Sequence, residues 1–248
     1  MIQIKHLRKS FGSKVVLKDV NLEIPKGSTT VILGLSGQGK STIIKHIVGL
    51  LKPDSGEIVV DGTDVANCSK QELFETRKKI GFLFQEGAMF DSMSVYDNVA
   101  FPLREHTKMS EEEIKKSVFE KLDMVGFDSD RVAKLYPHEL SGGMRKGAAT
   151  ARAIVLEPKI ILYDEPTSGL DPIISDLISR MTMMLKKELG ITSIVISHDL
   201  KETFKIADYV GMLYNGEIIE FASPEDFKNS KNEVVQAFLR GDSTKFDI

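Results

Sequence analysis

One segment, Gly34–Thr42, constrains the fold of this chain more than any other part of the sequence. It reads GLSGQGKST and stands between a β-branched apolar segment, Ser28–Leu33, and a segment with apolar residues at helical spacing, Ile43–Leu51. Glycines let the backbone curl, so that successive N–H groups and the positive end of the following helix point at phosphate oxygens. The pattern predicts a strand, a phosphate-binding loop and a helix, in that order.

The residue types in this loop predict how it holds a nucleotide. Lys40 would reach the β- and γ-phosphates, and the Ser41 hydroxyl would bind Mg²⁺. The loop residues expected to contact the nucleotide are Ser36, Gly37, Gln38, Gly39, Lys40, Ser41 and Thr42. The alternative is a glycine-rich turn that happens to precede a lysine, and the flanking strand and helix argue against it.

Composition narrows the class of protein. A chain of 248 residues fits one large domain, or one domain with a subdomain, better than two independent folds. The formal net charge of -3 supplies no field that would gather nucleic acid non-specifically. Cys68 is the only cysteine, which excludes an intrachain disulfide and favours a reducing cytoplasm. No segment approaches the roughly 18 apolar residues of a membrane span, so any membrane role requires a partner.

The organisation of the chain changes twice. Residues 1–85 resemble strands separated by turns, with Met1–Leu7 alternating like an edge strand. Residues 87–157 are helical in pattern, most clearly after the capping box Ser110–Glu113. Strands and helices alternate again beyond Lys159, as in a parallel α/β core; the expected elements are Ile160–Tyr163, Ile173–Leu189, Ser193–Ile196 and Tyr209–Tyr214. The tail from Ser223 predicts a short amphipathic helix and a mobile polar end, 242–247.

Two carboxylates follow the apolar strand Ile160–Tyr163. A buried strand delivers acids rigidly at its carboxyl end, where ligands of parallel sheets bind. Asp164 would support Mg²⁺ and its water shell, and Glu165 would act as general base toward the attacking water. Taken alone, Asp-Glu after a strand is often only the solvated start of a loop, but its pairing with a phosphate loop favours the chemical interpretation.

A second anion site identifies the family. Leu140–Met144 reads LSGGM and precedes an alanine-rich helical run, which places a serine hydroxyl and glycine amides at another helix N-terminus. Together with the phosphate loop and the acid pair, this resembles the ATP-binding cassette (ABC) family. In that family two subunits pair head to tail, and each signature loop caps the nucleotide held by the partner. The resemblance covers the chain from Ile2 to about Phe227.

The resemblance implies roles for three further side chains. Phe11 would stack on adenine, Gln85 would link Mg²⁺ and the attacking water to a transmembrane partner, and His198 would contact the γ-phosphate. Each has an alternative: a core aromatic for Phe11, a strand-end amide for Gln85 and a structural histidine for His198. The implied catalytic set is thus Glu165, His198 and Gln85, and the implied metal ligands are Ser41, Gln85 and Asp164.

The signature loop departs from the family's commonest form. Met144 stands where that form has glutamine, and a methionine side chain donates no hydrogen bond, so Ser141, Gly142 and Gly143 would carry the phosphate contact. Gln38 is also less usual than a small residue in the phosphate loop, which leaves its role intact because backbone amides do the binding.

The family also implies a fold. It is α/β, a P-loop NTPase (RecA-like) core with an N-terminal antiparallel β subdomain and an inserted α-helical subdomain. The expected organisation is a single ABC ATPase domain over 1–227, with the core at 1–86 and 158–227, the helical subdomain at 87–157, and a tail at 228–248. ATP and Mg²⁺ are the implied cofactors.

A narrower resemblance rests on Leu83–His106, Leu140–Lys146 and Asp164–Ile173. These segments look like the ATPases of the Mla and mammalian-cell-entry (Mce) lipid transport systems. The resemblance implies a cytoplasmic subunit on the inner face of the inner membrane that powers phospholipid transport. Its partners would be an integral-membrane permease and a second copy of itself, with a Mce-domain protein and a small regulatory subunit as further candidates and no nucleic acid.

The residues Gly87–Phe90 would form an apolar groove for a helix of the permease. The alternative is that they pack the helical subdomain. Two other function classes remain open: an ATPase of a different transporter, for amino acids or metals, and a non-transport cassette acting on DNA or ribosomes. The last usually carries two cassettes, coiled-coil insertions or basic patches, which this sequence lacks.

Overall fold

A computed structural model describes residues 1–246 of the chain. They form two compact units, one made of Met1–Thr76 and the residues from Thr192 onward, the other of Arg77–Ile191. The boundary between Thr76 and Arg77 falls within the helix α2 (Lys70–Lys78). The helical subdomain expected at 87–157 lies wholly within the second unit, and its boundaries stay a prediction.

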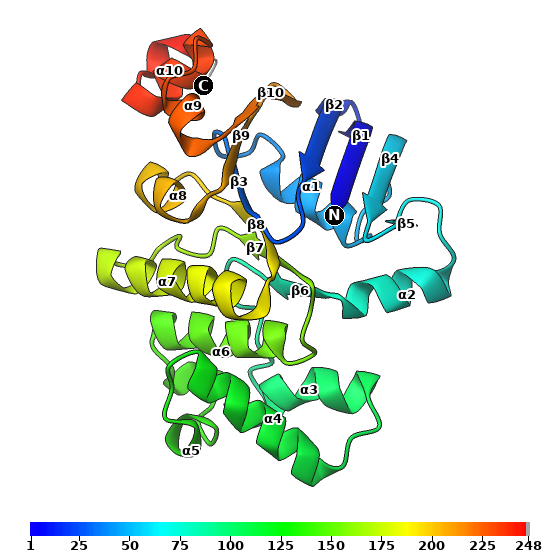
Figure 1. Ribbon diagram of the computed structural model, residues 1–248, viewed down its shortest axis with the longest axis vertical. Helices are drawn as coiled ribbons and strands as arrows, with labels where there is room; N and C mark the ends of the chain where they lie inside the picture. Colours follow the sequence, from blue (N-terminus) through cyan, green and yellow to red (C-terminus); the bar gives the residue numbers. More distant parts are fainter. Residues whose placement is uncertain (247–248) are drawn as a thin grey trace. The chain divides into compact units, whose positions relative to one another are not determined.

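The first unit is built on a mixed sheet with strand order β5-β4-β1-β2-β10-β9-β3-β8 (Figure 1). Its strands are β1 (Ile2–Phe11), β2 (Lys14–Ile24), β3 (Thr29–Leu33), β4 (Ser55–Val60), β5 (Thr63–Asp64), β8 (Thr192–Ile196), β9 (Tyr209–Tyr214) and β10 (Glu217–Ala222). Its helices are α1 (Lys40–Ile47), α8 (Leu200–Ile206), α9 (Pro224–Lys228) and α10 (Glu233–Arg240), with a 3₁₀ turn at Ser243–Lys245.

The pairing confirms the expected fold class. β1 pairs antiparallel with β2 and β4, which forms the antiparallel β portion, whereas β3 pairs parallel with β8 and β9. Every residue of β3 and β8 is buried, as strands covered on both faces require. The expected edge position of the N-terminal strand is wrong, because β1 lies between β2 and β4. Alternation of apolar and polar residues indicates that one face of the strand is buried. An interior strand of an antiparallel sheet has one buried face, as an edge strand does, so alternation does not distinguish them.

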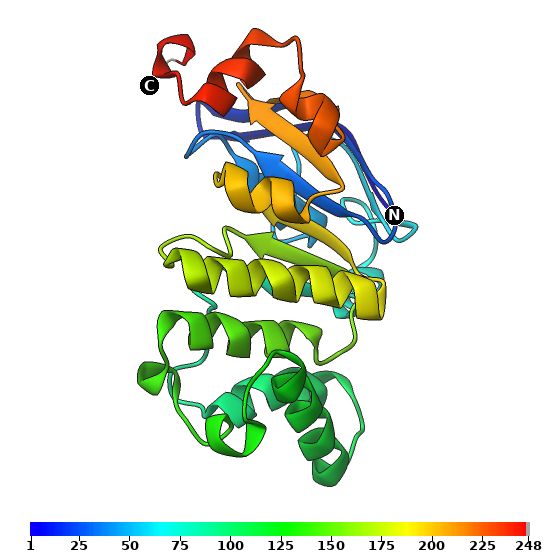
Figure 2. The same ribbon diagram turned by 60° about the vertical axis from the view of Figure 1, so that its left-hand side comes forward.

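The second unit combines two parallel strands with a set of helices. The strands β6 (Ile80–Leu83) and β7 (Ile160–Asp164) are paired in parallel. The helices are α3 (Val95–His106), α4 (Glu111–Met124), α5 (Ser129–Val132), α6 (Gly142–Ile154) and α7 (Pro172–Leu189), with a 3₁₀ turn at Pro137–Glu139. α6 contacts α7 on one side and α3 and α4 on another (Figure 2).

Local sequence explains why these helices begin where they do. Ser110 and Glu113 form the expected capping box of α4, and the apolar residues Ile114, Val118 and Leu122 are buried on one face. Asp171 caps α7 by accepting hydrogen bonds from the N–H groups of Ile173 and Ile174. The four elements expected beyond Lys159 match β7, α7, β8 and β9 to within one residue at each end, whereas β1 continues past Leu7 to Phe11 and α1 ends at Ile47 instead of Leu51.

The tail differs from the prediction. From Ser223 it forms two short helices, α9 and α10, rather than one. Phe246 is buried against the rings of Tyr214 and Phe238, which gives the end of the tail a packed contact, and the mobility expected of 242–246 stays a prediction. The apolar ring of Phe246 supplies packing that the mostly polar composition of the segment did not indicate. The expectation for residue 247, and the end of the predicted tail 228–248, lie outside the described residues.

Candidate functional site

The phosphate loop joins the buried end of β3 to the start of α1. Its glycines take backbone conformations that other residues rarely adopt, with φ of 152° at Gly34, 76° at Gly37 and 98° at Gly39. A Cβ atom on Gly39 would lie 2.6 Å from Cγ1 of Val16, so the loop is also closely packed at its helical end. Conformation and packing together explain why glycine stands at these positions.

Lys40 is the charged centre of the loop. Its side chain is buried, and its Nζ donates hydrogen bonds to the carbonyl oxygens of Gly34 and Leu35, both at 2.9 Å. The ammonium therefore lies over the curled backbone, where it is positioned to meet an anion bound by the loop. On the outer side of the loop, Oε1 of Gln38 accepts a hydrogen bond from the N–H of Asn215 at 3.2 Å. This contact gives Gln38 a structural role beside its backbone amide.

His198 and Phe11 belong to the same unit as the loop. β3 and β8 run in parallel with Ile32 opposite Ile196, so the loop after β3 and His198 after β8 follow the same end of neighbouring strands. His198 is exposed, and the next residue, Asp199, caps α8. Phe11 ends β1 with its side chain 47% exposed, which argues against the core alternative for this aromatic. The structure thus brings His198 to the loop's end of the sheet and leaves Phe11 available to a ligand.

The acid pair and Gln85 lie together in the second unit. Leu83 of β6 stands opposite Tyr163 of β7, so Gln85 and the acids follow the same end of two parallel strands. Asp164 is buried, and Glu165 has a φ of 47°. A non-glycine residue in the left-handed region is uncommon, and such strain is found preferentially at functional sites.

The Ser141 loop forms the N-terminus of α6. The Ser141 Oγ caps the helix by accepting a hydrogen bond from the N–H of Met144 at 3.3 Å. Gly142 and Gly143 form the first turn of the helix, and a Cβ atom on Gly143 would come within 2.7 Å of Cγ2 of Ile174. Serine hydroxyl and glycine amides therefore share one helix end, as an anion site requires.

Sequence reasoning missed Lys146, which lies one turn further along α6. Its side chain is buried and donates to the carbonyl oxygen of Gln85. Burial lowers the pKa of Lys146, and the carboxylates of Asp164, Glu86 and Glu165 oppose that shift. The bond joins residues far apart in the sequence, and a lysine in the first turns of a helix gives no signal for it.

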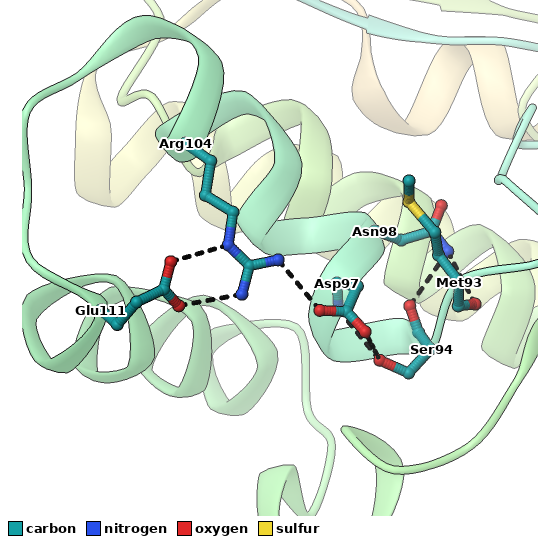
Figure 3. Close-up of polar contacts among 6 residues, drawn as sticks. All are labelled: Met93, Ser94, Asp97, Asn98, Arg104 and Glu111. Atoms are coloured by element: carbon teal, nitrogen blue, oxygen red, sulfur yellow. Dashed lines mark hydrogen bonds and ion pairs between the residues drawn. The ribbon is translucent and has the colours of Figure 1, made fainter.

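The segment after Gln85 is held by buried polar groups. Gly87 is buried against Ala149, whereas Phe90 is 42% exposed. The side chain of Asn98 is fully buried; its Nδ2 donates to the carbonyls of Met93 and Ser94, as Figure 3 shows, and also to that of Phe90. Gly87 therefore does not contribute to an exposed surface, and the groove expected at Gly87–Phe90 stays a prediction.

Within residues 1–246 no helix has the length and hydropathy that a membrane crossing requires. In the same residues no cluster of three or more His, Cys, Asp or Glu side chains is placed to hold a metal ion. Mg²⁺ bound with a nucleotide needs few protein ligands, because phosphates and water complete its shell, and the side-chain oxygens of Ser41, Gln85 and Asp164 are of the donor type that it prefers.

A family model described as "ABC transporter" matches residues 17–168. The chain belongs to the ABC transporter family. It is an ATPase that binds and hydrolyses ATP, as the members of this family do. Among solved structures it is similar to the ATP-binding cassette MJ0796, in a dimeric post-hydrolysis state bound to ADP and Pi, with a TM-score of 0.83 and 34% identity. That match covers 90% of this chain and 99% of the cassette.

Two kinds of curated relative carry different names. The chain is 44% identical to the intermembrane phospholipid transport system ATP-binding protein MlaF of Haemophilus influenzae, over 98% of this chain and 91% of that protein. It is 47% identical to the probable ribonucleotide transport ATP-binding protein mkl of Mycobacterium leprae, over 97% of this chain. The chain spans about two thirds of the length of the mycobacterial relatives, 69% for M. leprae and 66% for M. tuberculosis.

Proposed function

We propose that this chain is the nucleotide-binding subunit of a transporter that moves phospholipid between bacterial membranes through an integral-membrane permease. The observation that carries the proposal is the match to MlaF, which extends over nearly the full length of both proteins. The mkl relatives are more similar in identity, and the chain spans about two thirds of their length. Because these relatives are named for ribonucleotide transport, a test must distinguish ribonucleotide from phospholipid as the cargo.

The proposed mechanism assigns binding to the loops and chemistry to the acids. The phosphate loop, with Lys40, holds the β- and γ-phosphates of ATP, and Phe11 stacks on the adenine. Glu165 accepts the proton of the attacking water, and His198 contacts the γ-phosphate. Mg²⁺, bound through Ser41, Asp164 and Gln85, would supply charge neutralisation at the phosphates.

Two copies would complete each nucleotide site. In this proposal the Ser141 loop of one copy caps the ATP held by the phosphate loop of the other, head to tail. The N-terminus of α6, with its capping serine and its glycine amides, suits the phosphates of that ATP. ATP then stabilises the closed pair by binding at their interface, and hydrolysis removes that stabilisation.

The proposed contact with the permease lies at the exposed Phe90 and its neighbours. Phe90 follows the Gln85 loop and stays partly exposed although its backbone is fixed by Asn98. A fixed backbone that presents an aromatic ring suits the docking of a partner helix. The subunit would accordingly lie at the cytoplasmic face of the inner membrane, with a Mce-domain protein and a small regulatory subunit as further candidate partners.

The test is a reconstituted transport assay. The tagged chain would be purified with its membrane partners and placed in lipid vesicles, and two ATP-dependent signals measured: removal of a fluorescent phospholipid and uptake of a radiolabelled ribonucleotide. The proposal predicts the first signal and not the second, and predicts that Glu165→Gln abolishes it. ATP-driven ribonucleotide uptake without phospholipid movement would refute the lipid assignment and leave the ATPase chemistry intact.

A further inference from the structure

The helix α6, which carries the Ser141 loop, also holds the backbone that follows β6. Two of its cations reach that segment: Lys146 donates to the carbonyl of Gln85, and Arg152 donates to the carbonyls of Gly87 and Ala88 at 2.7 and 2.9 Å. Charged donors to carbonyl oxygens make stronger hydrogen bonds than neutral ones. Three carbonyls of one short loop are thus bound by a single helix.

Burial strengthens this attachment. Lys146 has a relative exposure of 5%, and the Arg152 side chain lies with its guanidinium 5.9 Å from the centre of the Phe90 ring. A buried charged donor without its acceptor is costly, so each cation favours the one loop conformation that supplies its carbonyls. The loop and α6 are therefore expected to move as one body.

A third contact closes the far end of the segment. Asn98 on α3 accepts a hydrogen bond from the N–H of Phe90 at 2.8 Å and donates to the carbonyl of Phe90. It also donates to the carbonyls of Met93 and Ser94 (Figure 3). The segment from Gln85 to Ser94 is held at both ends. The carboxylates of Asp164 and Glu165 raise the pKa of Lys146 against the effect of burial, whereas burial alone lowers the pKa of Arg152.

We propose that Lys146 is a positioning residue for ATP hydrolysis, because it ties the backbone of Gln85 to the Ser141 helix beside the acid pair. Lys146 touches no substrate in this account; it fixes where the Gln85 side chain points. The inference rests on the proposed role of Gln85, and it is independent of which cargo is transported. A misplaced positioning group lowers the rate of the chemical step more than it lowers binding.

The alternative is that Lys146 only stabilises the fold. The two readings differ in what its loss changes. A structural role predicts a lower melting temperature with kcat and KM for ATP changing little in the folded protein. A positioning role predicts a fall in kcat at nearly constant KM, because the phosphate loop that binds ATP is untouched.

The experiment compares Lys146→Met with Lys121→Met in the full-length chain. Lys121 is a matched control: it is also a buried lysine of the second unit, but its ammonium contacts Glu120 and Glu157. For Lys146→Met we expect kcat to fall roughly 10- to 100-fold with KM for ATP within about twofold of wild type. Amide hydrogen exchange over 85–88 should accelerate in this variant and stay unchanged in Lys121→Met.

Two measurements on Lys146→Met and one on Gln85→Ala test the inference. Wild-type kcat in folded Lys146→Met, or unchanged exchange over 85–88, would overturn the inference. If Lys146→Met does not fold, Lys146→Gln keeps an amide donor of shorter reach, and the same kcat and exchange measurements apply to it. Gln85→Ala is measured in parallel: a normal kcat there would refute the proposed role of Gln85 itself, whereas a low kcat with a normal Lys146→Met would refute only the positioning role.

Discussion

The phosphate loop and the Ser141 loop both place glycines at the start of a helix, yet the glycines answer different physical needs. Gly37 has a φ of 76°, and a Cβ atom there would have nothing within 4 Å. Gly143 lies in the first turn of α6 without a positive φ, but its Cβ atom would be 2.7 Å from Ile174. At Gly37 glycine is needed for conformation, and at Gly143 it is needed for close packing.

This difference fits the role proposed for each loop. The phosphate loop must wrap its own backbone around an anion, which requires dihedral angles that side chains disfavour. The Ser141 loop uses an ordinary helix end and a serine cap, and its glycines let the helix start lie close to Ile174 and Leu170 of the segment after the acids. The phosphate loop thus needs glycine for its dihedral angles, with close packing added at Gly39, whereas the Ser141 loop needs glycine for packing alone.

The largest expected effect comes from a change in the acid pair, which leaves both loops intact. Glu165→Gln should lower ATP turnover by about 10²- to 10⁴-fold while ATP affinity persists, because the proposed general base is lost and neither loop is altered. Turnover is measured by phosphate release and affinity by a fluorescent ATP analogue. Turnover that survives the change would assign the base to another residue.

A smaller effect tests the charge inside the first loop. Lys40→Ala should weaken ATP binding roughly 10- to 100-fold, because a charge-assisted contact with the phosphates is removed. Lys45→Ala, a lysine on the same helix but outside the loop, is the control and should bind ATP normally. Equal affinities in the two variants would contradict this placement of the phosphates.

The third prediction tests the comparison itself. Gly37→Ala and Gly143→Ala should each destabilise the protein by about 1–3 kcal/mol, the first through backbone strain and the second through overpacking. Adding Ile174→Ala should recover stability only in the Gly143→Ala background. Chemical denaturation of the two double variants measures this, and equal behaviour would erase the distinction between the loops.

The smallest expected effect concerns the pH dependence of stability that comes from ion pairs of the helices α3 and α4. Arg104 pairs with Glu111 through two bonds of 2.9 Å and with Asp97 at 3.0 Å (Figure 3). The pKa of Asp97 is lowered by the Ser94 hydroxyl and then by Arg104, and the pKa of Glu111 is lowered by Arg104. Folded-state pKa values below the ordinary 3.8 and 4.5 mean that this stability is present above those values and is lost as the pH falls through the lowered ones.

Arg104→Met measures that contribution. Because the pairs are partly exposed, the melting temperature at neutral pH should fall by roughly 1–3 °C, and the loss of stability on acidification should become shallower. Melting curves between neutral pH and about pH 3 provide the test. An acid dependence as steep as that of the wild type would show that other carboxylates dominate it.

The sequence predicts local features of this molecule better than distant ones. The phosphate loop, the capping box at Ser110 and the acid-bearing strand depend on neighbouring residues, and each was found where the pattern placed it. The interior position of β1 depends on which strands pair with it, which alternation does not reveal. The Lys146–Gln85 bond and the Gly143–Ile174 approach depend on long-range packing, so no spacing along the chain could indicate them.

In the proposed mechanism the two loops act on one nucleotide from different copies. Mixing two single variants tests it: Lys40→Ala disables the first loop, and Ser141→Asp keeps a side chain that can cap α6 while placing a negative charge against the phosphates. Each variant alone should hydrolyse little ATP, and their equimolar mixture should recover up to about a quarter of wild-type turnover, since half the dimers are mixed and each has one intact site. Turnover of the mixture no greater than the average of the two variants would contradict the account.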